Sequence, residues 1–168
     1  MKLRMRAPRL GFHVVLVEPE IPQNTGNVAR LCAATGSRLH LVGELGFRTD
    51  DKAVRRAGLD YWHLVEVSQH PDFATCLGAI GGGEPLLFSA NTDRDFRGAS
   101  YSPGGILVFG SESRGLPAGL TDERRDRVYA IPTAAGSVRS LNLANAVAVV
   151  VYHGLGAIGA LDGTLVEE

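Results

Sequence analysis

The chain has 168 residues, of which 45% are hydrophobic and 21% charged, and its formal net charge is −1. This length and composition are typical of one globular domain with its own core, and no apolar run reaches the roughly 18 residues that a membrane span needs. The basic start Met1–Arg6 lacks the apolar segment of a secretory signal, so a cytoplasmic protein without membrane contact is expected. The balanced net charge gives no overall support for nucleic-acid binding.

The hydrophobic pattern predicts strands that alternate with helices along the whole chain. Strands are expected at residues 12–18, 38–42, 63–67, 85–89, 105–109 and 127–131. Helices are expected at residues 24–36, 51–56, 70–80 and 141–156, the first with an Asn/Thr cap and a terminal Gly36. This alternation indicates an α/β fold, with a mostly parallel sheet and helices on both faces. We assign residues 12–158 to one domain, 1–11 to a basic N-terminal tail and 159–168 to a C-terminal tail.

The cysteines and histidines show no pattern of a disulfide or a metal site. Cys32 and Cys76 are far apart, form no C-x-x-C motif and fall in apolar helical patterns, so reduced core thiols are expected. The five histidines are scattered without the spacing of metal ligands. No metal site is therefore predicted.

Three polar, glycine-containing segments follow the ends of predicted strands, and they are residues 18–27, 110–117 and 131–140. In an open α/β sheet, ligands bind beyond the carboxyl ends of the strands, so we expect a site there. The third segment runs directly into an apolar helix that begins with Asn142 and Asn145, two amides on one turn that need partners.

Common nucleotide and hydrolase motifs are excluded. Gly110 and Gly115 have the spacing of a phosphate loop, but Leu116 and Pro117 stand where Lys and Ser/Thr are required. No G-x-G-x-x-G follows the first strand, and no G-x-S-x-G elbow occurs.

Two features have more than one interpretation from the residues alone. Asn24, Asn27 and Arg30 share one broad helical face, which either points into the site or faces solvent. Glu112 and Arg114 either form an ion pair that fixes their loop or contact the substrate.

The sequence resembles the SPOUT class of RNA methyltransferases over residues 12–153. Residues 18–36, 109–117 and 131–147 resemble the three motifs of that class, in the same order. Residues 50–61 are similar to those of the small single-domain branch, which methylates the ribose 2′-hydroxyl of the wobble cytidine or uridine in certain leucine tRNAs. Residues 133–138 depart from the usual motif.

The resemblance implies a deep C-terminal trefoil knot, S-adenosylmethionine bound bent in the knot without a metal, a tRNA substrate and an obligate homodimer. The implied catalytic residues are Arg30, Glu112, Arg114 and Asn142. The implied cofactor-binding residues are Phe88, Gly110, Ile131, Ser140 and Leu141. The RNA-binding residues are expected to be Asn27, Lys52, Arg55, Arg56 and Arg139.

Some alternatives stay open at this point. The target is either the wobble nucleotide or another position of tRNA or ribosomal RNA, and a non-catalytic, cofactor-binding RNA module is a further alternative. Arg30 acts either as the base or as a positioning group.

Overall fold

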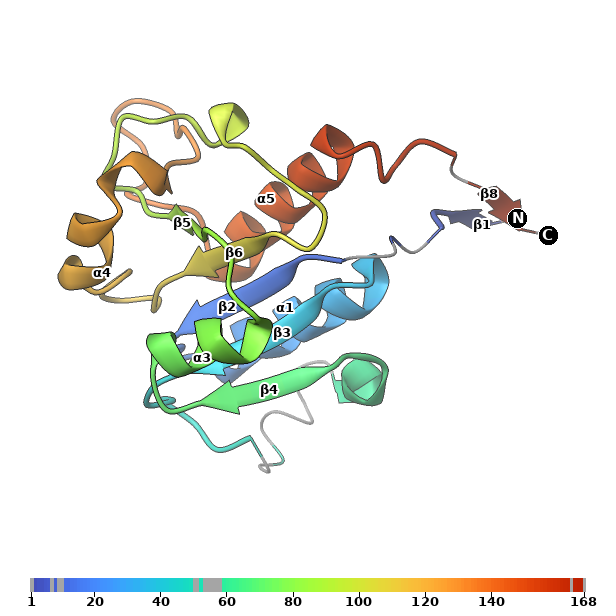
Figure 1. Cartoon of the computed structure of the whole chain (residues 1–168), viewed down its shortest axis with the longest axis horizontal. Helices are drawn as coiled ribbons and strands as arrows, with labels where there is room; N and C mark the ends of the chain where they lie inside the picture. The colour runs from blue at the N-terminus through green and yellow to red at the C-terminus, as the bar shows by residue number, and fades with distance from the viewer. Residues whose placement is uncertain are drawn as a thin grey trace.

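The computed structural model describes residues 2–6, 8, 11–49, 52, 59–163 and 165–167. Within these residues, six parallel strands form one sheet in the order β4-β3-β2-β6-β5-β7 (Figure 1). Their bounds are β2 (His13–Val17), β3 (Arg38–Val42), β4 (Val67–His70), β5 (Leu86–Phe88), β6 (Ile106–Phe109) and β7 (Val128–Tyr129). The predicted parallel sheet is confirmed.

Helices cover both faces of the sheet, as the alternating pattern predicts. The helices are α1 (Pro22–Thr35), α3 (Phe73–Ile80), α4 (Ala118–Glu123) and α5 (Leu143–Ala157). Val14 and Leu16 of β2 belong to a core cluster with α1 and α5. Val15 and Val17 belong to a second cluster, against which α3 and α4 pack. Successive side chains of a strand point to opposite faces, so one apolar strand supports both layers.

The order of the strands creates a switch point between β2 and β6. The chain proceeds outward from β2 through β3 to β4, crosses to β5 on the other side, and returns as β6 beside β2. The loop after β2 leads to α1 on one face, while the loop after β6 leads to α4 on the other. Loops that diverge in this way leave a crevice at the carboxyl ends of the strands.

Helix α1 begins earlier than predicted, and the expected Asn/Thr cap is wrong. Its N-cap is Ile21, which makes no side-chain cap bond, and Pro22 is the first helical residue. Proline suits this position because its missing N–H would have no intrahelical partner. The helix ends at Gly36 as predicted, in a left-handed conformation with φ of 66°.

The strand expected at residues 63–67 is also wrong. Residues Leu59–Leu64 form the 3₁₀ helix η1, and the strand follows it as β4. The register with β3 explains the shift, because Leu39 pairs with Val67 and Val42 with His70. The helix expected at residues 51–56 lies outside the described residues, apart from Lys52.

Smaller differences concern the ends of elements. Helix α3 begins at Phe73 after Asp72, whose carboxylate accepts the Thr75 N–H at 2.7 Å. Helix α4, the 3₁₀ helix η2 (Phe96–Gly98) and the 3₁₀ helix η3 (Arg125–Arg127) were not predicted. Their short lengths give little periodic signal.

The two ends of the chain pair with each other. Strand β1 (Lys2–Arg4) pairs with β8 (Leu165–Glu167) as a two-stranded antiparallel sheet, away from the main sheet in Figure 1. Among the described residues, no helix combines the length and apolar character needed to cross a membrane.

Candidate functional site

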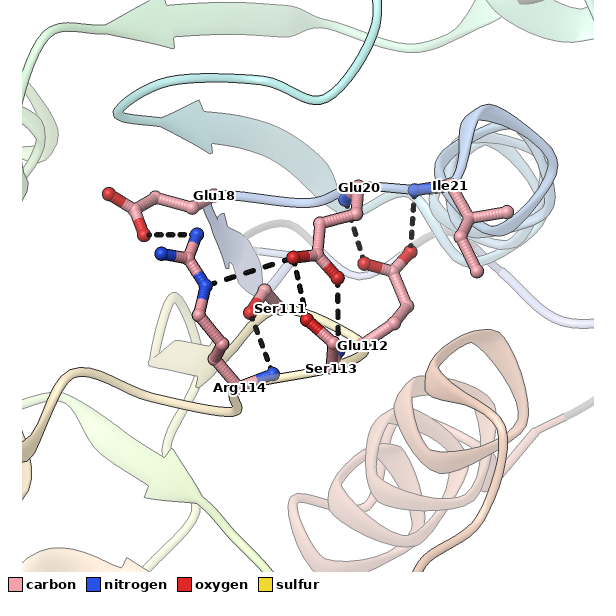
Figure 2. A network of polar contacts seen from close by, with 7 residues as sticks. All are labelled: Glu18, Glu20, Ile21, Ser111, Glu112, Ser113 and Arg114. Atoms are coloured by element: carbon pink, nitrogen blue, oxygen red, sulfur yellow. Dashed lines mark hydrogen bonds and ion pairs between the residues drawn. The ribbon is translucent and has the colours of Figure 1, made fainter.

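The loops after β2 and β6 are joined at the switch point by ion pairs and hydrogen bonds (Figure 2). Arg114 lies 3.2 Å from the carboxylate of Glu18 and 3.7 Å from that of Glu20. Ser113 donates to Glu20 through its hydroxyl at 2.7 Å and its backbone N–H at 3.0 Å. These two bonds, helped by the Arg114 charge, lower the pKa of Glu20. The contacts hold two predicted motifs together at the sheet edge.

The loop after β6 is a tight turn that requires glycine. Ser111 and Gly115 exchange two backbone hydrogen bonds of 3.1 and 2.9 Å, and Gly115 has φ of 69°. A Cβ atom on Gly110 would lie 2.0 Å from the carbonyl carbon of Gly115 and 2.2 Å from the nitrogen of Leu116. No side chain fits at residue 110, so the backbone of this turn is held close to the end of β6.

Glu112 binds the start of α1. Its carboxylate accepts the backbone N–H groups of Glu20 at 2.7 Å and Ile21 at 3.0 Å, as well as the side-chain amide of Asn24 at 3.0 Å. A carboxylate is stabilised at a helix N-terminus by unpaired N–H groups and the helix dipole. Glu112 therefore fixes the backbone that enters α1, by binding the two N–H groups that precede Pro22. Among the described residues, Arg114 forms its ion pairs with Glu18 and Glu20, so the expected Glu112–Arg114 pair is replaced.

Asn24 connects all three predicted motifs. Its side chain is only 6% exposed, donates to Glu112 and accepts from the side-chain amide of Asn142 at 3.0 Å. Asn142 is the N-cap of α5, and its side-chain oxygen accepts the N–H groups of Ala144 at 2.9 Å and Asn145 at 3.4 Å. The amide of Asn142 thus has its expected partners, whereas Asn145 is exposed to solvent.

The other two residues of the predicted polar face of α1 point outward. Asn27 and Arg30 are exposed, while Asn24 is buried, so the predicted polar face is divided between the network and the surface. Helix α1 contacts α5 alongside. Arg30 lies nearly two helical turns beyond Asn24 along α1.

The residues expected to bind the cofactor mark the carboxyl ends of β5, β6 and β7. Phe88 stacks on Phe109 with ring centroids 5.0 Å apart, and both rings are buried in the core at the ends of β5 and β6. Ile131 follows β7 and is half-buried, whereas Ser140 and Leu141 are exposed just before α5. Phe88, Gly110 and Ile131 thus lie at or just beyond the ends of β5, β6 and β7, whereas Ser140 and Leu141 belong to the segment that leads into α5.

A hollow of about 870 Å³ opens beside this site. It is lined by Glu18, Ser89, Asn91, Thr92, Asp93, Arg94, Arg114, Gly115, Leu116, Pro117, Ala118, Thr121, Asp122, Arg125 and Val128. Of the predicted catalytic and cofactor-binding residues, only Arg114 lines it. Residues 89–94, which contribute to the lining of this hollow, were not predicted as part of the site. This polar segment follows β5 as the other site loops follow their strands.

Three of the five expected RNA-binding residues are described. Asn27, Lys52 and Arg139 are exposed. Arg55 and Arg56 lie outside the described residues.

The fold and its three joined motifs agree with the SPOUT class of RNA methyltransferases expected from the sequence. The model of the SpoU rRNA Methylase family matches residues 11–152. The chain belongs to this family, and the predicted membership is confirmed.

Relatives and solved structures agree with this assignment. A tRNA (cytidine(34)-2′-O)-methyltransferase of Escherichia coli K12 is 43% identical over 152 residues, covering 88% of this chain and 94% of the relative. A putative RNA methyltransferase of Bacillus anthracis has a TM-score of 0.83 at 39% identity, and the match covers 94% of this chain and 100% of that one. A structure concerned with 2-OH methylation of C/U34 on tRNA has a TM-score of 0.79 at 45% identity, and the match covers 86% of this chain and 94% of that one.

A structure with cofactor is also similar. An AdoMet-bound rRNA methyltransferase of Sinorhizobium meliloti has a TM-score of 0.71 at 25% identity, and the match covers 90% of this chain and 59% of that one.

Proposed function

We propose that the protein transfers a methyl group from S-adenosylmethionine to the ribose 2′-hydroxyl of nucleotide 34 of tRNA. The observation that carries this proposal is the hydrogen-bonded chain Glu112–Asn24–Asn142, which joins the three motifs at the switch point. The protein's family membership and the relatives named for tRNA cytidine 34 support the proposal that nucleotide 34 of tRNA is the substrate. We further assign leucine tRNAs as the substrates and the cytoplasm as the location.

The cofactor is proposed to lie bent within a trefoil knot at the ends of β5, β6 and β7. Residues 132–142 are exposed, so their backbone N–H and C=O groups can face a small ligand. The buried, stacked rings of Phe88 and Phe109 support the strand ends beneath this segment. Gly110, Ile131, Ser140 and Leu141 would hold the cofactor largely through the backbone, and no metal takes part.

The bound cofactor supplies an electrophilic methyl group, and the protein has to align the ribose and accept one proton. The cofactor would give its methyl group to the 2′-oxygen and leave as S-adenosylhomocysteine. The 2′-hydroxyl proton would pass to Arg30 if this residue is the base, and to solvent water if Arg30 only positions the ribose. Arg114 and Asn142 are proposed to orient the ribose and its phosphate from the two loops at the switch point. Arginine suits this task because its planar donors match phosphate oxygens.

Glu112 is proposed to act as a positioning group in this reaction. Its carboxylate already accepts three hydrogen bonds at the start of α1. Both carboxylate oxygens are occupied in this way, and they face the backbone and Asn24 of the loop and helix beside them. Its contribution is to fix Asn24, and through Asn24 the substrate-facing Asn142.

Arg30 is proposed to stand closest to the reacting 2′-hydroxyl. Making an arginine neutral at pH 7 costs about 8 kcal/mol, so a base role requires strong help from other positive charges in the complex. A positioning role, in which the cation binds the phosphate beside the ribose, carries no such cost.

We propose a homodimer with the site near the subunit interface. Val149 and Tyr152 of α5 are 39% and 46% exposed, and Leu141 just before α5 is 37% exposed. Apolar side chains exposed along one helix favour burial against a partner.

Methyl transfer to tRNA tests the proposed function directly. The purified protein, S-adenosylmethionine and unmodified leucine tRNA are expected to yield 2′-O-methylated nucleotide 34, identified by mass spectrometry of nuclease fragments. A leucine tRNA with a 2′-deoxy nucleotide 34 is the matched control and should accept no methyl group. Methylation at another nucleotide would contradict the assigned position, and absence of transfer to any tRNA would contradict the activity.

A further inference from the structure

Three histidines form a diagonal row across β2, β3 and β4. His13 Nδ1 lies 2.9 Å from His40 Nε2, and His40 Nδ1 lies 3.0 Å from His70 Nε2. The parallel register places Val15 beside His40 and Val42 beside His70, so the three rings share one face of the sheet. His40 in the middle is buried, and the two outer rings are partly exposed.

Cys76 of α3 completes this cluster. A ring nitrogen of His40, a ring nitrogen of His70 and the Sγ atom of Cys76 all lie within 4.8 Å of one another. Cys76 is fully buried and forms no disulfide. Helix α3 covers the same face of the sheet as Val15, Val17 and Val42. His40, His70 and Cys76 therefore join β3, β4 and α3 on the face opposite α1 and α5.

We propose that His40, His70 and Cys76 bind one divalent transition-metal ion, with zinc as the ion that fits best. Imidazole and thiolate are the ligands that zinc prefers, whereas magnesium and calcium prefer oxygen. Bonds of about 2.0–2.1 Å to nitrogen and about 2.3 Å to sulfur separate the ligand atoms of a tetrahedral site by about 3.3–3.6 Å. The nitrogens of His40 and His70, now 3.0 Å apart, need to separate by only a few tenths of an ångström.

His13 has a supporting role in this site. When His40 binds the ion through Nδ1, its ring hydrogen stays on Nε2 and is donated to His13 Nδ1 at 2.9 Å. Ligating histidines commonly donate their second nitrogen in this way, which fixes the orientation of the ring. The same contact that links two strands thus holds a ligand in place.

Binding releases one proton for each ion. The two imidazoles are neutral and each keeps its single ring hydrogen, whereas the Cys76 thiol gives up its proton to solvent as the metal–sulfur bond forms. A water molecule fills the fourth position, and the ion enters from the side of the partly exposed His70.

The site has a structural role and is separate from the proposed methyl transfer. It ties the edge strand β4 and helix α3 to β3, whereas Asn24 and Asn142 belong to α1 and the start of α5. The spacing of the ligands along the chain gives no motif because each comes from a different element.

Cobalt(II) is a suitable probe because it replaces zinc and absorbs light. The full-length protein, freed of metal with a chelator, is titrated with cobalt chloride alone. We expect one equivalent to bind, with the visible bands of tetrahedral cobalt and a near-ultraviolet thiolate band, and one proton to be released. One equivalent of zinc should remove these bands and raise the Tm.

Two pairs of variants decide the ligands. Cys76→Ala should lose the thiolate band, whereas Cys32→Ala, which removes the other buried cysteine, should keep it. His70→Gln should weaken cobalt binding at least about tenfold, whereas His63→Gln, at an exposed histidine, should not. Circular dichroism checks the fold, and His70→Gln decides the matter if Cys76→Ala does not fold.

The competing explanation is a row of hydrogen-bonded imidazoles that binds no ion. Absence of a thiolate band at stoichiometric cobalt, or a band that persists in Cys76→Ala, would overturn the proposed site. Neither result depends on methyl transfer, so the two proposals fail or stand separately.

Discussion

The side-chain amide of Asn142 donates to the side-chain oxygen of Asn24 at 3.0 Å, across 118 residues of sequence. Both amides have a second partner that fixes their direction. The oxygen of Asn142 caps α5, and the NH₂ group of Asn24 donates to Glu112, which only accepts. The start of α5, the start of α1 and the turn after β6 are therefore held in one directed chain of hydrogen bonds.

Asn24→Ala should impair both stability and turnover. It removes two side-chain hydrogen bonds, one to Glu112 and one from Asn142, and their loss costs about 1–3 kcal/mol of the free energy of unfolding. We also expect at least a tenfold fall in kcat, because the Asn142 side chain loses its fixed direction. Denaturant unfolding and methyl transfer to leucine tRNA measure the two effects. Asn145→Ala, at an exposed asparagine one turn into α5, should change neither. Equal effects of the two substitutions would contradict the role of the network.

Gly110→Ala should destabilise the protein strongly. The added methyl group would lie about 2 Å from backbone atoms of Gly115 and Leu116, which cannot move aside as a flexible side chain can. We expect a loss of at least about 1–3 kcal/mol in the free energy of unfolding, measured by denaturant titration. Gly119→Ala is the matched control, because its Cβ atom meets nothing within 4 Å inside α4. That variant should be neutral or more stable by about 0.5–1 kcal/mol.

Alternation of apolar strands and helices was enough to predict the parallel sheet, both helical layers and the edge that carries the site. Such patterns report which side chains are buried, and burial decides the layers of an α/β fold. Ends of elements were harder to predict. The N-terminus of α1 depends on Glu112, 91 residues beyond Ile21, and no local pattern contains that information.

The features that the sequence did not predict depend on contacts between residues that are far apart in the chain. Sequence placed Asn24, Glu112 and Asn142 near one edge, but not the order in which they bond. An ion pair between Glu112 and Arg114 was one of two alternatives, and among the described residues Arg114 instead pairs with Glu18 and Glu20 of the loop after β2. The histidine row was missed for a similar reason, since parallel register brings together residues that show no spacing along the chain.

The link between the loops at the switch point should weaken in acid. Hydrogen bonds from Ser113 hold the pKa of Glu20 below its ordinary value of 4.5. A lowered pKa in the folded state adds stability at pH values above 4.5, and this stability is lost as the pH falls through the folded value. Nuclear magnetic resonance titration of the Glu20 carboxyl carbon should report a midpoint below 4.5 that rises in Ser113→Ala. Ser137→Ala, in the loop before α5, should leave it unchanged.

Lys52 is expected to bind a tRNA phosphate. It is exposed, and phosphate contacts make binding depend on salt through the release of counterions. Lys52→Ala should weaken tRNA binding and reduce the slope of log K against log salt by about 0.7–0.9. Lys2→Ala, in the strand at the end of the chain, is the control. Identical slopes for Lys52→Ala and the parent protein would exclude this contact.

Arg30→Ala should lower kcat by at least about a hundredfold without changing the affinity for S-adenosylmethionine. The reason is its proposed place beside the reacting ribose, away from the loops that would hold the cofactor. Arg30→Lys distinguishes the two roles. If Arg30 binds a phosphate as a cation, lysine should partly replace it and restore turnover with an unchanged pH profile. If Arg30 is the base, Arg30→Lys should shift the pH profile of turnover. Arg38→Ala, which removes an exposed arginine paired with Glu66, is the matched control. Near-normal turnover of Arg30→Ala with intact cofactor binding would remove Arg30 from the catalytic site.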